Sequence, residues 1–289
     1  MNGTALALVL VAAIVHAAWN LAAKRVRDGG AGFVFLYYTV SAVLMVPFVI
    51  ATLLTGQQSP QWSWLAAAGI TAVCHVAYGV VLQRGYSAGD LSVVYPLARG
   101  SGPLLAVLVA VLVLGERPGW LGLAGAVLVV GGVLVISGRP SGTNARARRA
   151  GVGYGVLTGA TIAAYTLWDA YAVGVLGVPP VVYFGAGALL QSLLLAPIAL
   201  RGKRRAHAGS LWSAHRREVL LVGVLSPVAY LLVLFAMRLA PVSLVAPARE
   251  VSIVLGSLVG WLLLGEPDPT RRLGGSLVVL AGITAIAFA

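Results

Sequence analysis

Long, uninterrupted stretches of apolar residues dominate the chain, and short polar connectors separate them. A helix needs about 20 such residues to cross the hydrocarbon core of a bilayer. The stretches lack the ten-residue alternation that is typical of membrane barrel strands. The pattern predicts an all-α integral membrane protein with ten membrane-spanning helices, at residues 4–23, 32–55, 62–83, 91–114, 119–137, 151–173, 179–200, 218–237, 242–264 and 272–289.

The overall composition agrees with this prediction. The chain is 60% hydrophobic and 10% charged, whereas a soluble domain carries about 25% charged residues. The longest connectors, 139–150 and 201–217, are too short to form a soluble domain. Cys74 is the only cysteine, so an intramolecular disulfide and a paired-cysteine metal site are excluded.

The second half of the chain repeats features of the first half about 150 residues later. Leu-Gly-Glu closes both the fourth span (Glu116) and the ninth span (Glu266), and Pro96 with Arg99 recurs as Pro247 with Arg249. We predict two five-helix repeats, at 1–138 and 151–289, joined by a basic linker at 139–150. Because each repeat has an odd number of spans, the second repeat enters the membrane upside down.

The basic residues predict an orientation. Lys and Arg gather in the connectors that follow odd-numbered spans, while the connectors after even-numbered spans hold only Arg117 and Arg238. The positive-inside rule then places the odd connectors in the cytoplasm and both termini outside. This topology also explains the net charge of +12, so we expect no nucleic-acid partner. The N-terminus has no basic residue before its first apolar stretch, which is kept as the first helix.

Two arginines lie inside predicted spans, where a charged side chain is costly. Arg99 and Arg249 each follow a proline, and a proline-interrupted helix belongs beside a cavity. In one interpretation both arginines bind an anionic group at a central site. In the other, Arg249 pairs with Glu250 or a neighbouring span and only stabilises the bundle.

The carboxylates and histidines inside spans also have two interpretations. Asp169 and Glu250 are candidates for proton coupling, or partners of the arginines in structural ion pairs. His16 and His75 could relay protons, or simply form structural hydrogen bonds. Glu116 and Glu266 lie at span ends, where we expect turn or cap residues.

Aromatic residues within the spans suggest a cavity lined by rings, with helix packing as the alternative. Trp62, Trp64, Trp120 and Trp212 lie near span ends and are predicted to form an interfacial belt. With Asn20 and the two arginines added, the predicted substrate-binding set is Trp19, Asn20, Tyr78, Tyr95, Arg99, Tyr165, Trp168, Tyr230 and Arg249.

The paired Leu-Gly-Glu motifs before Gly-rich fifth spans, and Trp19-Asn20 followed by Lys24, resemble the EamA-type branch of the drug/metabolite transporter superfamily. The resemblance implies ten helices around a central cavity, built mainly by the third, fourth, eighth and ninth spans. It points to the regions of Tyr78, Arg99, Tyr230 and Arg249. Such proteins move small metabolites, amino acids or drugs, commonly by export. They usually keep both termini in the cytoplasm, in contrast to the charge rule here.

The sequence therefore predicts a secondary transporter, and in particular an exporter, of a small anionic or zwitterionic metabolite in the plasma membrane. Its expected partners are this substrate and the lipid bilayer, and we expect a monomer without a cofactor, apart from proton coupling. No HExxH, GxSxG or Walker motif is present, so we expect no enzyme. The alternatives are an intramembrane enzyme acting on lipid-linked substrates and a non-transporting membrane subunit or sensor.

Overall fold

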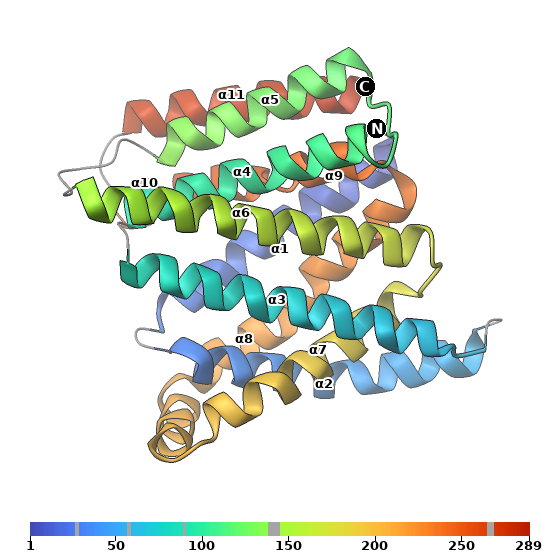
Figure 1. Ribbon diagram of the computed structural model, residues 1–289, viewed down its shortest axis with the longest axis vertical. Helices are drawn as coiled ribbons and strands as arrows, with labels where there is room; N and C mark the ends of the chain where they lie inside the picture. The colour runs from blue at the N-terminus through green and yellow to red at the C-terminus, as the bar shows by residue number, and fades with distance from the viewer. Residues whose placement is uncertain (27–28, 57–58, 89–90, 138–144, 265–268) are drawn as a thin grey trace.

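The computed structural model describes residues 1–26, 29–56, 59–88, 91–137, 145–264 and 269–289. Within these ranges the chain is almost entirely helical and contains no strand. The helices are α1 (Gly3–Lys24), α2 (Gly30–Thr55), α3 (Trp62–Ala88), α4 (Leu91–Leu112), α5 (Gly119–Ser137), α6 (Ala145–Gly174), α7 (Pro180–Ala199), α8 (Lys203–Leu239), α9 (Val242–Ala248), α10 (Val251–Leu264) and α11 (Pro269–Phe288). Figure 1 gives their arrangement.

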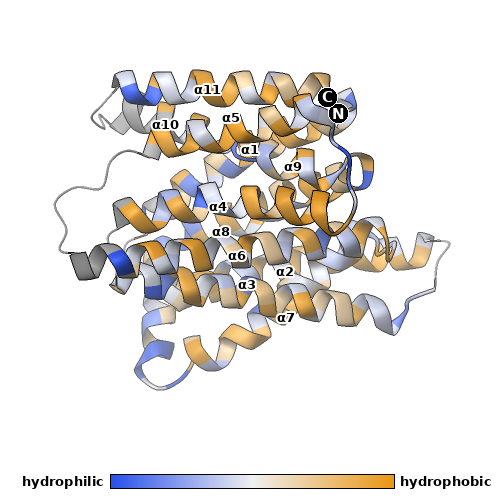
Figure 2. Cartoon of the chain, turned by 45° about the horizontal axis from the view of Figure 1, so that its top comes forward, coloured by the Kyte–Doolittle hydropathy of each residue, from blue (hydrophilic) through white to orange (hydrophobic). Residues whose placement is uncertain are grey.

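Among the described residues, eight helices are long and apolar enough to cross a membrane: α1, α2, α3, α4, α5, α7, α8 and α11. The helix α6, which holds Asp169, is not among them, and α9 and α10 are shorter, with 7 and 14 residues. Many large apolar side chains face outward, for example Leu54 (81% exposed) and Val43 (66%). Hydrophobic residues run along most helices in Figure 2. This apolar exterior suits contact with lipid.

The predicted spans agree with the helices to within a few residues, apart from three differences. The helix α6 begins at Ala145, so the second half of the predicted linker is helical. The helix α8 begins at Lys203, inside the predicted 201–217 connector, and a kink at His215 separates its first part from the rest. The predicted ninth span is divided into α9 and α10. Pro247 lies next to this division. It explains the break, because proline removes a backbone donor and clashes with the preceding turn of the helix.

The helices pack in matching pairs across the two halves. The contact of α1 with α8 has its counterpart in that of α3 with α6, and the contact of α2 with α8 in that of α3 with α7. The helices α5 and α11 lie side by side at one edge of the bundle (Figure 1). A Cβ on Gly125 would lie 2.7 Å from the Gly282 carbonyl oxygen, and one on Gly132 would lie 2.7 Å from that of Gly275. This reversed order means that α5 and α11 run antiparallel.

The two chain ends lie together. The Met1 ammonium lies 3.4 Å from the carbonyl oxygen of Ile286, and Figure 1 shows N and C at the same corner of the bundle. Of the four tryptophans predicted at the interface, Trp62, Trp120 and Trp212 are exposed. For Trp64 the prediction was wrong: its side chain is 5% exposed and belongs to the main core, because it lies with Ala67 and Ala68 on the face of α3 that packs inward.

Candidate functional site

A central cavity of about 160 Å³ lies between the helices of the two halves. Its lining comes from α1, α2, α3, α4, α6, α7, α8, the turn between α9 and α10, and the first residues of α10. A water needs only about 10–15 Å³ on a comparable measure. The cavity is therefore large enough for a small solute.

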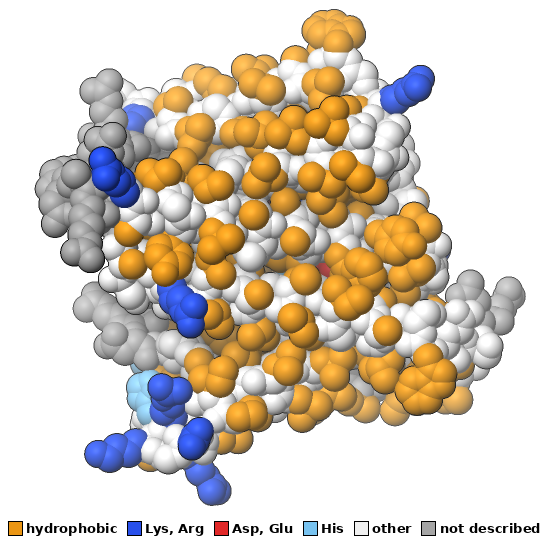
Figure 3. Space-filling model, viewed as in Figure 1, with side chains coloured by type: hydrophobic (Ala, Val, Ile, Leu, Met, Phe, Trp, Pro, Cys, Tyr) orange, Lys and Arg blue, Asp and Glu red, His pale blue; other side chains and the backbone are white. Residues whose placement is uncertain are grey.

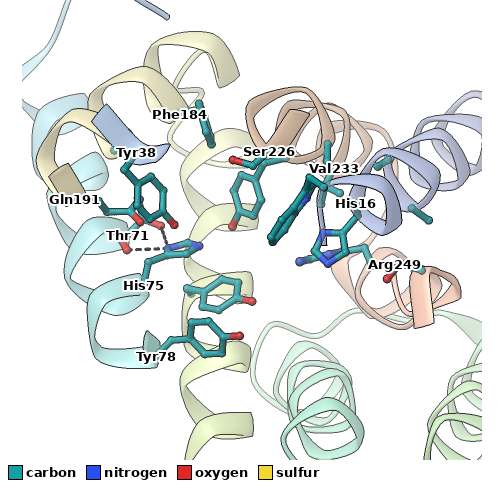
Figure 4. Close-up of a pocket in the computed structure, with 18 of the residues that line it drawn as sticks. His16, Tyr38, Thr71, His75, Tyr78, Phe184, Gln191, Ser226, Val233 and Arg249 are labelled. Atoms are coloured by element: carbon teal, nitrogen blue, oxygen red, sulfur yellow. Dashed lines mark hydrogen bonds between the residues drawn. The ribbon is translucent and has the colours of Figure 1, made fainter. Parts of the chain in front are cut away.

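The structure brings most of the predicted site residues together in this cavity. Figure 4 shows the rings and charged side chains converging on it from several helices. The predicted residues that line it are His16, Trp19, His75, Tyr78, Arg99, Tyr165, Tyr230, Arg249 and Glu250. They come from both halves of the chain, so neither half forms the site alone.

Four predicted residues do not line the cavity. The Asn20 amide donates to the His16 carbonyl oxygen of its own helix at 2.9 Å, and the Trp168 indole N–H donates to the Ala67 carbonyl oxygen at 3.0 Å. Tyr95 is 37% exposed, and Asp169 is fully buried behind the cavity wall. Asn20 and Trp168 therefore have structural contacts in this conformation.

The turn between α9 and α10 places Arg249 and Glu250 at the cavity. Three hydrogen bonds of i to i−3 spacing hold the turn: Glu250 N to Pro247 O (3.0 Å), Ser252 N to Arg249 O (3.2 Å) and Ile253 N to Glu250 O (2.9 Å). Irregular backbone at membrane depth is tolerated where it lines a cavity. The turn thus carries two charged side chains into the centre of the bundle.

Neither the Arg99 nor the Arg249 guanidinium forms an ion pair with a described residue. Among the described residues, the one salt bridge joins His215 and Glu218. Instead, the Arg249 Cζ lies 5.9 Å from the centre of the Tyr230 ring, and the Arg99 Cζ lies 5.7 Å from that of Tyr95. Both contacts are cation–π interactions. The charged lining residues are two arginines and one glutamate, a net charge of 2 − 1 = +1 with neutral histidines.

Asp169 lies outside the cavity and forms hydrogen bonds with residues of its wall. Its carboxylate accepts hydrogen bonds from the hydroxyl groups of Thr71 (2.6 Å), Tyr183 (2.5 Å) and Tyr230. All three donors line the cavity. Asp169 therefore fixes the orientation of three polar groups that face the cavity.

The two histidines of the cavity contact aromatic rings. The His75 ring stacks on Tyr165 with 4.2 Å between centres, and its Nδ1 lies 2.9 Å from the Thr71 carbonyl oxygen. His16 meets Trp19 edge to face at 4.7 Å. His75 thus belongs to a hydrogen-bonded group with Thr71, a contact drawn in Figure 4, and Thr71 in turn donates to Asp169.

Three buried polar atoms of the lining have no hydrogen-bond partner within the described part of the chain: Trp19 Nε1, Gln191 Oε1 and Glu250 Oε2. Unsatisfied buried polar atoms are rare, and each asks for an explanation. One donor and two acceptors of residues that line the cavity are thus left without a partner among the described residues.

Sequence reasoning missed several lining residues, namely Tyr37, Tyr38, Thr71, Tyr183, Phe184, Gln191, Ser226 and Ser252. Gln191 carried a usable signal, because it is a lone amide within an apolar stretch. Tyr37 and Tyr38 form an adjacent pair of rings, 4.7 Å apart, in the second span. The others carried no signal that distinguished them from packing residues.

Among the described residues, no group of three or more His, Cys, Asp or Glu side chains is placed to hold a metal ion. Glu116, predicted as a turn or cap residue, caps a helix: its carboxylate accepts hydrogen bonds from the backbone N–H groups of Val242 and Ser243. Glu266, predicted to act in the same way, lies outside the described residues.

A model of the EamA-like transporter family matches the chain twice, at residues 3–138 and 149–288. The chain belongs to this family. The resemblance seen in the sequence is thereby confirmed, and this EamA-like protein is a multi-pass membrane protein. Among curated proteins, no match is found.

Solved structures support the fold independently. Matches include 29 chains, one of them called "Crystal structure of protein". That structure is 17% identical in sequence, with a TM-score of 0.76, over 100% of this chain and 98% of the other. At this level of identity the likeness concerns the fold alone.

Proposed function

We propose that this EamA-like protein is a secondary transporter that moves a small anionic or zwitterionic metabolite by alternating access. The observation that carries the proposal is that Arg99 of the first half and Arg249 of the second half line one cavity, and neither forms an ion pair with a carboxylate of the described residues. Glu250, in the same cavity, offsets only one of the two charges. A buried charge without a partner is costly. A bound anionic group would reduce this cost at both arginines.

The unpaired polar atoms refine the substrate class. The arginines suit a carboxylate or a phosphonate, because guanidinium binds planar and tetrahedral oxyanions by paired hydrogen bonds. Glu250 Oε2 and Gln191 Oε1 suit a donor such as an ammonium group. A zwitterion of small size would satisfy both kinds of group at once.

Alternating access needs two halves that move against each other, and the packing supports an inverted repeat. The reciprocal glycine contacts of α5 and α11 are those expected across a two-fold axis in the membrane plane. We propose ten crossings, with α9 and α10 together forming the ninth, and repeats at 1–138 and 151–289 joined by 139–150. The adjacent termini fit an even number of crossings.

The proposed orientation follows from charge. In Figure 3, Lys and Arg gather on the left of the molecule, on the side opposite the two termini, with few on the right. We propose that this basic side faces the cytoplasm, so that both termini lie outside the plasma membrane. The direction of transport, export, rests on the family resemblance rather than on the site.

For coupling, we propose that a proton on Glu250 exchanges during the cycle. Glu250 lines the cavity, is 5% exposed and has one oxygen without a partner. Asp169, the other candidate, is held by three hydroxyl donors and serves better as a positioning residue. We propose a monomer that needs no resident cofactor and catalyses no chemical reaction.

A thermal-shift screen of the detergent-purified protein against anionic, zwitterionic, neutral and cationic metabolites tests the proposal. Anions or zwitterions should raise the melting temperature of the wild type, and Arg99→Gln should abolish this effect. The matched control is Arg117→Gln, which removes an exposed arginine outside the cavity. Stabilisation by cations or neutral amphiphiles alone would contradict the proposal.

A further inference from the structure

The first turns of α8 form a separate helix that does not continue the membrane-spanning part. Residues 203–214 are joined to the rest of α8 at His215, whose backbone is non-helical (φ −127°, ψ 27°). In Figure 1 this part appears end-on at the lower left, across the direction of the other helices. We refer to residues 201–217 as the surface segment.

One side of the surface segment is anchored in the bundle. Ala208 (3% exposed) and Leu211 (5%) are buried, and Leu211 belongs to a core cluster with Phe33 at the start of α2. The Leu211 Cδ1 would lie 3.2 Å from a Cβ on Gly32, so the surface segment and α2 are in close contact. Trp212, on the flank, is 41% exposed. The apolar side of the segment therefore packs on the bundle, while the exposed Trp212 ring is of the kind found at the headgroup level of a bilayer.

The outer side of the surface segment carries a strong positive charge. Residues 201–217 contain six Lys or Arg and no Asp or Glu. All six are exposed: Arg201, Lys203, Arg204, Arg205, Arg216 and Arg217. The next acidic residue, Glu218, lies 3.9 Å from His215. Blue side chains gather at this corner of the molecule in Figure 3.

We propose that the surface segment binds the headgroups of anionic phospholipids in the leaflet where it lies. Guanidinium groups pair with phosphate oxygens, and the exposed Trp212 ring suits the headgroup level. Each basic side chain near an anionic surface contributes about fivefold in affinity. Beyond the kink, α8 supplies Ser226, Ala229 and Tyr230 to the cavity. A bound lipid therefore fixes the start of a cavity-lining helix.

The test measures the melting temperature of the full-length protein in detergent with added phosphatidylglycerol, phosphatidylcholine or inorganic phosphate. Native mass spectrometry counts the bound lipids in the same samples. The variant Lys203→Gln/Arg205→Gln removes two exposed charges of the surface segment. The control Arg117→Gln/Arg238→Gln removes two exposed charges elsewhere, Arg117 in the connector after α4 and Arg238 in the last turn of α8.

Phosphatidylglycerol should raise the melting temperature of the wild type and of the control, with phosphatidylcholine and phosphate having no such effect. The Lys203→Gln/Arg205→Gln variant, with an unchanged melting temperature without lipid, should bind phosphatidylglycerol about tenfold or more weakly. An equal effect of phosphatidylcholine or of free phosphate would overturn the proposal. So would an equal loss of phosphatidylglycerol binding in both double variants.

Discussion

The Glu116 carboxylate caps α9, with its Oε1 3.0 Å from the backbone nitrogen of Val242 and its Oε2 2.9 Å from that of Ser243. The acceptor belongs to the first half of the chain and the helix to the second. The first N–H groups of a helix have no partner within it, and lipid offers none. A carboxylate also interacts favourably with the positive end of the helix. The Leu-Gly-Glu motif that ends the fourth span thus fixes the start of the ninth.

Replacing this cap should destabilise the protein. Glu116→Ala leaves two part-buried N–H groups without an acceptor, and we expect a loss of about 1–3 kcal/mol in the free energy of unfolding. Thermal unfolding of the purified protein measures the change. The neighbouring Arg117→Ala, which removes an exposed side chain, should change it little. Equal stability of the two variants would show that the cap contributes nothing.

The close contact of α5 with α11 offers a matched pair of glycines. A Cβ at Gly132 would lie 2.7 Å from the Gly275 carbonyl oxygen, whereas one at Gly131 would meet nothing within 4 Å. We expect Gly132→Ala to lower the melting temperature, because two backbones must move apart. Gly131→Ala should leave it unchanged or raise it, since alanine favours a helix by about 0.5–1 kcal/mol. A reversed order would contradict the packing described here.

Asp169 and Tyr230 should behave as a coupled pair. Tyr230→Phe removes one hydroxyl donor from a buried carboxylate, which costs about 1–3 kcal/mol. In a double-mutant cycle with Asp169→Asn, we expect a coupling energy of about 0.5–3 kcal/mol, measured by thermal unfolding. Tyr171→Phe, on an exposed ring of the same helix as Asp169, is the control. If the losses of unfolding free energy from the Asp169 and Tyr230 substitutions simply add, Asp169 does not position Tyr230.

Glu250 should govern how pH affects the binding of an anion. When Glu250 is ionised the cavity has a charge of +1, and when it is protonated the charge is +2, as counted above. Affinity for an anion should therefore fall as the pH rises. In Glu250→Gln this dependence should be lost, because the amide does not titrate. Binding of one anion that stabilises the wild type, measured over a range of pH, checks this, and the same pH dependence in both proteins would exclude Glu250 as the coupling group.

The hydrophobic pattern predicted the spans well because bilayer thickness imposes a similar length on each of them. The pattern did not locate the division at Arg249–Glu250. A proline precedes an arginine in both halves, yet α4 continues unbroken through Pro96 and Arg99, so the motif alone does not predict a break. The helical part of 201–217 was also missed. Its many basic residues indicated a connector, and the contacts of Ala208 and Leu211 with the bundle order it.

Sequence reasoning predicted the charged residues of the candidate site, because a charged side chain is costly in lipid. It failed where the rotation of a helix about its axis decides which side chains face the cavity. Arg99, Arg249 and Glu250 have no favourable place in lipid, so their position in the cavity follows from their charge. Trp168 and Tyr165 lie on the same helix, yet Tyr165 faces the cavity and Trp168 donates to Ala67. The packing of neighbouring helices determines this difference, and a single sequence does not record it.

The central claim, that Arg99 and Arg249 bind one anionic group together, is tested most directly by a binding cycle. An anion that stabilises the wild type is titrated into the wild type, Arg99→Gln, Arg249→Gln and the double variant, and each dissociation constant is measured by calorimetry. We predict that either single substitution weakens binding at least about tenfold, as expected for a hydrogen-bonded charge pair, and that the double variant binds little more weakly than the single ones. Unchanged binding in the single variants, or two losses that simply add, would contradict a shared site.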